Sequence, residues 1–182
     1  MRGVKIAAPL GVPFHFTGRA VAATLVLWLI LVLLGWLWLE VSWGMAFIFG
    51  LTATVLHWGS ELAHQCGHAW VARYVGFPMR GMRSWYVLIA AFYPRNEPQL
   101  PPLTHIKRAI GGPVVSLTLA LLGLFLWIYQ PAAGIGEGLI RFFTLENFFV
   151  FFLMALLPLG FTDGSTLLKW VPLWLAERQD RS

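Results

Sequence analysis

The chain has 182 residues, of which 58% are hydrophobic, 15% aromatic and only 12% charged. Soluble globular domains carry about 25% charged residues, so this composition and a mean hydropathy of +0.71 exclude an ordinary soluble domain and favour a membrane protein. The net charge of +5 does not indicate nucleic-acid binding, because the basic residues lie in short segments between apolar runs. The single cysteine, Cys66, excludes an intrachain disulfide.

Four apolar stretches are each long enough to cross a bilayer, which requires about 20 such residues. The predicted spans cover residues 20–39, 45–74, 109–129 and 142–160. The predicted fold class is therefore an all-α integral membrane protein with about four transmembrane helices. We expect these helices to form a single membrane domain over residues 1–182.

The segments outside the spans differ in character. Residues 1–19 contain no apolar core followed by a small-residue cleavage site, so we expect a cytosolic lead-in and not a removed signal peptide. Residues 76–107 contain five prolines and several β-favouring pieces, which predict an extended loop that includes a strand or hairpin. A short amphipathic tail over residues 165–177 is expected to lie on the membrane surface.

The distribution of basic residues predicts the orientation in the membrane. Twelve of the 13 Lys and Arg residues lie in the N-terminal segment, in the end of the second span with the loop after it, or in the C-terminal tail. Only Arg141 lies in a connection on the other side. Because cytoplasmic connections are rich in Lys and Arg, both termini and the loop over residues 76–107 are predicted to face the cytoplasm.

The second predicted span carries a polar stripe. At 100° per residue, five side chains share one helical face about 100° wide: His57, Glu61, His64, Gln65 and His68. Ionisable residues inside a span are costly and therefore indicate function. His64 and His68 are one turn apart, as in the motif His-Glu-x-x-His, where two imidazoles bind zinc and the glutamate activates a metal-bound water. Gln65 stands at the position of that glutamate.

Asp163 is the candidate third ligand. A catalytic zinc ion takes three protein ligands and leaves a fourth position for water. Asp163 is predicted near the cytoplasmic end of the fourth span, at the same depth in the bilayer as His64 and His68 in the second. The alternative to a metal site is a structural polar cluster in which the two histidines form a hydrogen-bonded interhelical pair.

Three motifs in register resemble the site-2 protease family of intramembrane zinc metalloproteases. They are Glu61-Leu62-Ala63-His64-Gln65-Cys66-Gly67-His68-Ala69 with Gly76-Phe77-Pro78 after it, Gly112-Pro113-Val114-Val115-Ser116, and Leu156-Leu157-Pro158 with Asp163-Gly164. The resemblance covers residues 44 to about 170 and implies that His64, His68 and Asp163 bind Zn²⁺. It also implies a hydrolase that carries out intramembrane proteolysis. We expect an integral multi-pass membrane protein of a prokaryotic cell membrane.

Three positions depart from the family pattern. Gln65 replaces the general base, Ser116 replaces the Asn after Gly-Pro, and Ala155 replaces the Asn before the proline. Since a positioned base contributes about 10²–10⁴ in rate, we expect a degenerate or weakly active relative. Natural divergence explains Gln65 better than deliberate inactivation, because two other positions have also changed. Glu61 is expected to orient a ligand or to pair with His57 or a neighbouring helix; the alternatives are a displaced base and a direct metal ligand.

The sequence leaves three functions open. They are a zinc metalloprotease homologue that cuts a membrane segment near its cytoplasmic side, a non-catalytic metal-binding protein that binds or regulates membrane partners, and an ion or proton pathway along His57 and Glu61. The expected partners are a membrane-protein substrate or partner helix and the lipid bilayer, and no nucleic acid. Outside the stripe, we expect His105 to be solvated and Glu146 and Asn147 to lie at the membrane interface.

Overall fold

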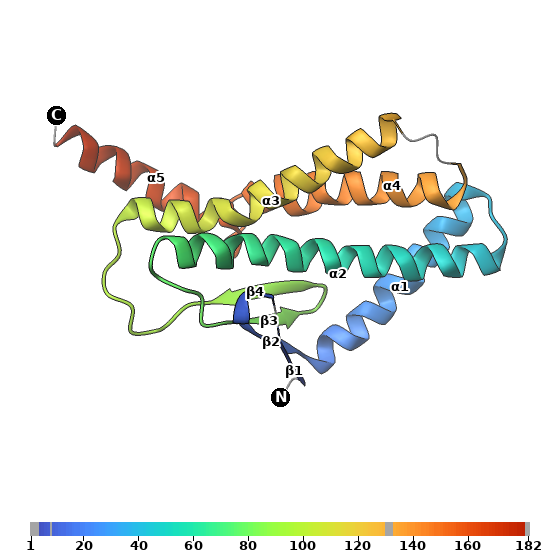
Figure 1. The fold of residues 1–182 in the computed structure, drawn as a ribbon, viewed down its shortest axis with the longest axis horizontal. Coiled ribbons are helices and arrows are strands. Elements are labelled where there is room, and N and C mark those ends of the chain that lie inside the picture. Colours follow the sequence, from blue (N-terminus) through green and yellow to red (C-terminus); the bar gives the residue numbers. More distant parts are fainter. Residues whose placement is uncertain (1–3, 8, 130–132, 181–182) are drawn as a thin grey trace.

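A computed structural model of the chain describes residues 4–7, 9–129 and 133–180. A long helix, α2 (Trp43–Tyr74), runs through the middle of the molecule (Figure 1). The helices α3 (Pro102–Tyr129) and α4 (Ile135–Leu145) lie on one side of α2, and a small β-sheet lies on the other. The helix α1 (Gly18–Leu39) packs against α2. The prediction of a mainly helical protein is confirmed.

The C-terminal third of the chain contains an irregular segment that matters for the site. A π-helix, η2 (Glu146–Met154), continues directly from α4. An irregular segment over residues 157–162 then leads into α5 (Asp163–Gln179), which begins beside α3 and extends past the bundle towards the C-terminus (Figure 1). The helical tail predicted over residues 165–177 lies within α5.

The sheet has the strand order β1-β2-β3-β4. The strands are β1 (Val4–Ala7), β2 (Pro13–Phe16), β3 (Gly81–Trp85) and β4 (Leu88–Phe92), and a short 3₁₀ helix, η1 (Pro9–Gly11), precedes β2. β2 and β3 run parallel, while β1 with β2 and β3 with β4 are antiparallel. A tight turn at Tyr86 and Val87 joins β3 to β4, which confirms the predicted hairpin. The N-terminal strands were not predicted, since each is only four residues long, β2 pairs with β3 of that hairpin and β1 pairs with β2.

Two apolar clusters hold these layers together. One lies between the sheet and the C-terminal half of α2, which is the half predicted to lie nearer the cytoplasm. The other joins α1, α2 and α4. The first consists of Val12, Phe14, Ala69, Met79, Met82 and Ile89, and the second of Leu31, Phe49 and Ala53. The first cluster fixes the sheet against the same part of α2 that carries the polar stripe.

Glycines allow α2 and α3 to pack with their backbones in close approach. A Cβ atom on Gly67 would overlap the carbonyl oxygen of Gly111 and lie 2.8 Å from Val115 Cγ2. A Cβ atom on Gly111 would overlap the backbone of Gly67 in the same way, at 2.6 Å from its oxygen. Small residues at helix contacts in membranes permit this kind of packing. The close approach brings the next residues of α3 within reach of the histidines of α2.

The predicted spans correspond to α1, α2, α3 and the α4–η2 pair, with altered boundaries. α3 begins at Pro102 and not at residue 109, so the loop predicted over residues 76–107 ends at residue 101; proline suits the first turn of a helix and explains the early start. In the part of the chain that the structure describes, two helices, α1 and α3, are long and apolar enough to cross a membrane. The count of four spans stays a prediction.

We expect Gly67→Ala to lower the stability by about 1–3 kcal/mol, because the added methyl group overpacks the contact between α2 and α3. Gly59→Ala in the same helix is the matched control. Its Cβ would meet nothing within 4 Å, and alanine favours a helix over glycine, so its stability should equal or exceed that of the parent. Thermal unfolding in detergent micelles measures both, and equal melting temperatures for the two variants would contradict the close approach.

Candidate metal centre

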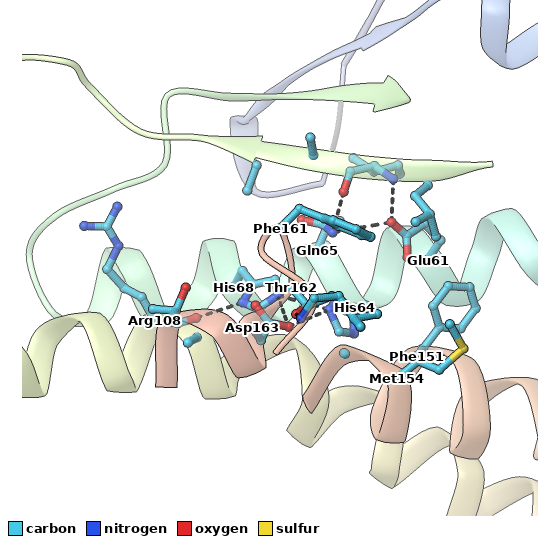
Figure 2. A pocket seen from close by; sticks show the side chains of 18 of the residues that line it. Glu61, His64, Gln65, His68, Arg108, Phe151, Met154, Phe161, Thr162 and Asp163 are labelled. Carbon is cyan, nitrogen blue, oxygen red and sulfur yellow. Dashed lines mark hydrogen bonds and ion pairs between the residues drawn. The ribbon is translucent and has the colours of Figure 1, made fainter. Parts of the chain in front are cut away.

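His64, His68 and Asp163 meet between α2 and the start of α5 (Figure 2). The two histidine Nε2 atoms lie 3.1 Å apart. Asp163 Oδ2 lies 3.4 Å from His64 Nε2 and 3.3 Å from His68 Nε2. Both histidines are buried and Asp163 is partly buried. The structure therefore brings together the three residues that the sequence indicated as candidate ligands.

Both imidazole rings are oriented through their Nδ1 atoms. His68 Nδ1–H donates to the backbone carbonyl of Arg108 at 2.8 Å, and His64 Nδ1 lies 2.8 Å from Ser116 Oγ. A neutral imidazole that donates through Nδ1 carries a lone pair on Nε2. His68 therefore directs a lone pair at Asp163, and His64 does the same when Ser116 accepts its Nδ1–H. Three acceptor atoms facing one another repel unless a cation lies among them.

Ser116 has a role that the sequence comparison with the family did not reveal. It appeared only as a departure from the family Asn, yet it is fully buried on α3 and holds the His64 ring. A partner of this kind fixes the tautomer and orientation of a metal-binding histidine. The hydroxyl group thus keeps a hydrogen-bonding group at the position where the family has an amide.

Gly112 lets α3 pass directly behind the two imidazoles. A Cβ atom at this position would overlap the Nε2 atoms of both His64 and His68. Pro113, the next residue, removes one backbone N–H from the helix at this point. The glycine of the Gly-Pro pair therefore has a steric reason, because no side chain fits between α3 and the histidines at this position.

Asp163 is the first residue of α5, and a folded loop places it. Thr162 Oγ1 donates to the Leu157 carbonyl, and Ser165 Oγ accepts from the Gly160 N–H at 2.7 Å. The N-terminal end of α5 favours a negative charge at Asp163, and the carboxylate faces both Nε2 atoms.

The geometry of these three residues fits a zinc ion. Zinc binds His nitrogen and Asp oxygen at about 2.0–2.2 Å in a tetrahedral arrangement, which separates neighbouring ligand atoms by about 3.3–3.5 Å. The observed separations of 3.1, 3.3 and 3.4 Å lie close to that value. Two imidazole nitrogens and one carboxylate oxygen, with both outer nitrogens hydrogen-bonded, are also a donor set that zinc prefers.

Glu61 and Gln65 lie on α2 near the ligands but reach towards β4 (Figure 2). Gln65 Nε2 donates to the Ile89 carbonyl at 2.8 Å, and Glu61 Oε1 accepts the Ile89 N–H at 2.6 Å. The hydrogen-bond partners of Glu61 among the described residues are a strand and Gln65, and no hydrogen bond joins it to His57 or to a neighbouring helix. Gln65 Oε1 is buried and has no hydrogen-bond partner among the described residues.

A second polar centre surrounds His57. His57 Nε2–H donates to the Val87 carbonyl at 2.7 Å, and His57 Nδ1 lies 2.6 Å from Glu146 Oε1, so this pair shares a proton. Asn147 Nδ2 donates to Ser60 Oγ at 2.9 Å. Glu146 and Asn147, which we expected at the membrane interface, are both buried within the protein, where η2 directs them towards α2.

Phe151 lies beside one histidine of each polar centre. Its ring centroid lies 5.5 Å from that of His57 and 6.3 Å from that of His64. Phe151 is buried and offers no group that carries a proton. Along the polar stripe of α2, His64 and His68 face the candidate ligand Asp163, whereas His57 faces η2 and the hairpin turn.

A cavity of about 530 Å³ opens beside the triad. His105 lines it and stacks on Trp170 with ring centroids 4.0 Å apart, so it is only partly solvated; the early start of α3 places it in a helix facing α5. At the same end, Arg108 pairs with Glu97 at 3.1 Å. The other walls are mainly apolar and aromatic and include Trp85, Leu88, Phe151, Met154 and Phe161.

The fold is similar to that of a solved membrane-protease structure. No protein-family model matches the sequence, and no curated protein matches it. The structure described as Site-2 Protease from Methanocaldococcus jannaschii aligns with a TM-score of 0.60 and 16% sequence identity, over 91% of this chain and 69% of that chain. At this identity the comparison shows a shared fold, and the candidate ligands rest on the geometry of this chain.

We expect Ser116→Ala to weaken zinc binding by about 10–100-fold, the usual effect of removing a group that orients a ligand. Thr118→Ala is the matched control on the same helix, because Thr118 is exposed and its hydroxyl donates only to the Val114 carbonyl. Competition of the purified protein against a zinc chelator measures both. Equal affinities in the two variants would show that Ser116 does not support the ligand His64.

Proposed function

We propose that this chain is a divergent member of the site-2 protease family, with a zinc site and little or no peptidase activity. The observation that carries the proposal is the arrangement of His64, His68 and Asp163 at the spacing of a tetrahedral zinc site. The shared fold and the three sequence motifs support the family part of the proposal. Gln65 and its contacts support the loss of activity.

At such a zinc site, the residues of this chain have separate roles. When bound, zinc acidifies a water molecule and polarises a scissile carbonyl group. His64, His68 and Asp163 hold the ion, while Arg108 and Ser116 orient the two rings. Gln65 Oε1 can accept a hydrogen bond but an amide does not take up a proton. Without a positioned base, the rate falls by about 10²–10⁴.

Glu61 does not replace the missing base in this arrangement. Its Oε1 atom accepts hydrogen bonds from the Ile89 N–H and from Gln65. These bonds direct its carboxylate towards β4 and away from the ligands (Figure 2). A general base must lie within hydrogen-bond reach of the proton that it removes. This observation favours the second candidate function, a metal-binding membrane protein that binds or regulates a partner helix without cutting it.

The structure gives less support to an ion or proton pathway along α2. Such a pathway requires a continuous chain of hydrogen-bonding groups, and among the described residues no hydrogen bond joins His57 to Glu61. His57 also shares its proton with Glu146 and donates to Val87, which holds it in place. We therefore place the zinc site first.

Zinc content and proteolysis test the proposal together. We expect the purified protein to bind about one zinc ion, and His64→Ala and Asp163→Ala each to lose it, because two ligands do not hold zinc tightly. Cys66→Ala, a half-buried neighbour outside the triad, is the control and should keep the metal. We expect no cleavage of a transmembrane test substrate above the His64→Ala background. A parent protein without zinc would overturn the metal site, and rapid zinc-dependent cleavage would overturn the loss of activity.

We propose further that both termini and the loop between β4 and α3 face the cytoplasm. In a Cys66→Ala background, a membrane-impermeant maleimide added to intact cells should label Gly44→Cys, at the exposed start of α2. It should label Asn96→Cys, in the exposed loop, only after the membrane is permeabilised. The reverse pattern would contradict an orientation that rests on the excess of cytoplasmic Lys and Arg.

A further inference from the structure

The outer edge of β4 is covered by side chains of α2. β4 is the last strand of the sheet, and its inner neighbour is β3, with Ser84 opposite Ile89. Along an antiparallel edge strand, every second residue directs its N–H and C=O outwards. Ile89 is such a residue, because both its backbone groups bond to side chains of α2. The Val87 carbonyl, two residues earlier, also faces α2.

Three side chains spaced by one helical turn make these bonds. His57 donates to the Val87 carbonyl at 2.7 Å, Glu61 accepts the Ile89 N–H at 2.6 Å, and Gln65 donates to the Ile89 carbonyl at 2.8 Å. His57 and Gln65 are two helical turns apart, about 12 Å along α2, whereas Val87 and Ile89 are two residues apart, about 6.6 Å along the strand. The three side chains of α2 therefore converge on a short stretch of β4.

Glu61 and Gln65 together resemble one residue of a neighbouring strand. In a hydrogen-bonded antiparallel pair, each residue accepts one N–H and donates one N–H to the residue opposite. The carboxylate of Glu61 supplies the acceptor, and the amide of Gln65 supplies the donor. Both atoms are buried, so the exchange takes place out of water, where a lost partner is costly.

We propose that Gln65 is a positioning residue for β4: with Glu61 it takes the place of a missing strand at Ile89 and holds the hairpin against α2. The amide of Gln65 then has a structural role, because it supplies the donor to the Ile89 carbonyl. Its presence is not explained by loss of the catalytic base alone. The proposal goes beyond the proposed function, because it does not depend on a metal ion or on proteolysis.

A glutamate at position 65 conflicts with this contact. In the place of Gln65 Nε2, a carboxylate oxygen would lie 2.8 Å from the Ile89 carbonyl oxygen and 3.4 Å from Glu61 Oε1. The carbonyl oxygen cannot donate a hydrogen bond to it, and a charged Glu61 carboxylate would repel it. The strand contact and a glutamate base therefore exclude each other at this position while Glu61 stays charged and in place.

Hydrogen–deuterium exchange of the full chain in detergent micelles tests the proposal. The reporter is the peptide that covers the turn and β4, residues 86–92. We expect Gln65→Glu and Gln65→Met each to speed its exchange about tenfold, because each leaves the Ile89 carbonyl without its donor. Cys66→Ala, the adjacent position on the same helix, should leave the exchange unchanged. Gln65→Met carries no charge and keeps the test valid if Gln65→Glu unfolds.

The second arm distinguishes a specific acid–amide pair from a general packing effect. Adding Glu61→Gln to Gln65→Glu removes the carboxylate repulsion, so we expect exchange about threefold slower in the double variant than in Gln65→Glu, which is a non-additive result. Unchanged exchange in both Gln65 variants, or strictly additive effects of the two changes, would overturn the proposal. Zinc content measured on the same samples reports on the proposed function separately.

Discussion

The arrangement of the site depends on three potential ligand atoms held within 3.1–3.4 Å of one another: His64 Nε2, His68 Nε2 and Asp163 Oδ2. When both rings donate through Nδ1, these atoms offer two lone pairs and a negative charge, which is unfavourable in a buried setting without a cation. The surrounding contacts nevertheless fix it. The Arg108 carbonyl and Ser116 hold the outer nitrogens of the rings, which leaves the inner nitrogens free for a cation.

The packing of α2 on α3 makes this convergence possible. Gly67 and Gly111 bring the two backbones into contact, and Gly112 leaves room for the imidazoles at the point of closest approach. The same closeness lets a carbonyl and a hydroxyl of α3 reach the rings. Asp163 then enters from a third direction, at the first turn of α5, after a loop fixed by Thr162. Backbone packing and ring orientation therefore follow from one contact between helices, whereas the third candidate ligand depends on the loop before α5.

The sequence predicted the parts of this site that depend on helical periodicity. The spacing of His64 and His68 places them on one face of a helix whatever the tertiary structure, and Gly112 and Asp163 belong to motifs with a fixed register. It did not predict the position of Glu146, because a π-helix shifts the phase of the residues that face α2. Nor did it predict β1 and β2, whose pairing is set by tertiary contacts and not by local pattern.

Position 65 lies at the border between two environments of one helix. Successive residues of α2 differ by about 100° in direction, so His64 and His68 face α3 and α5, while Glu61 and Gln65 turn far enough to reach β4. A base at position 65 has to face the metal side, whereas a donor to the Ile89 carbonyl has to face the strand. Under our proposal, the amide of Gln65 is retained because it secures the strand, and this accounts for an intact set of ligands beside a missing base.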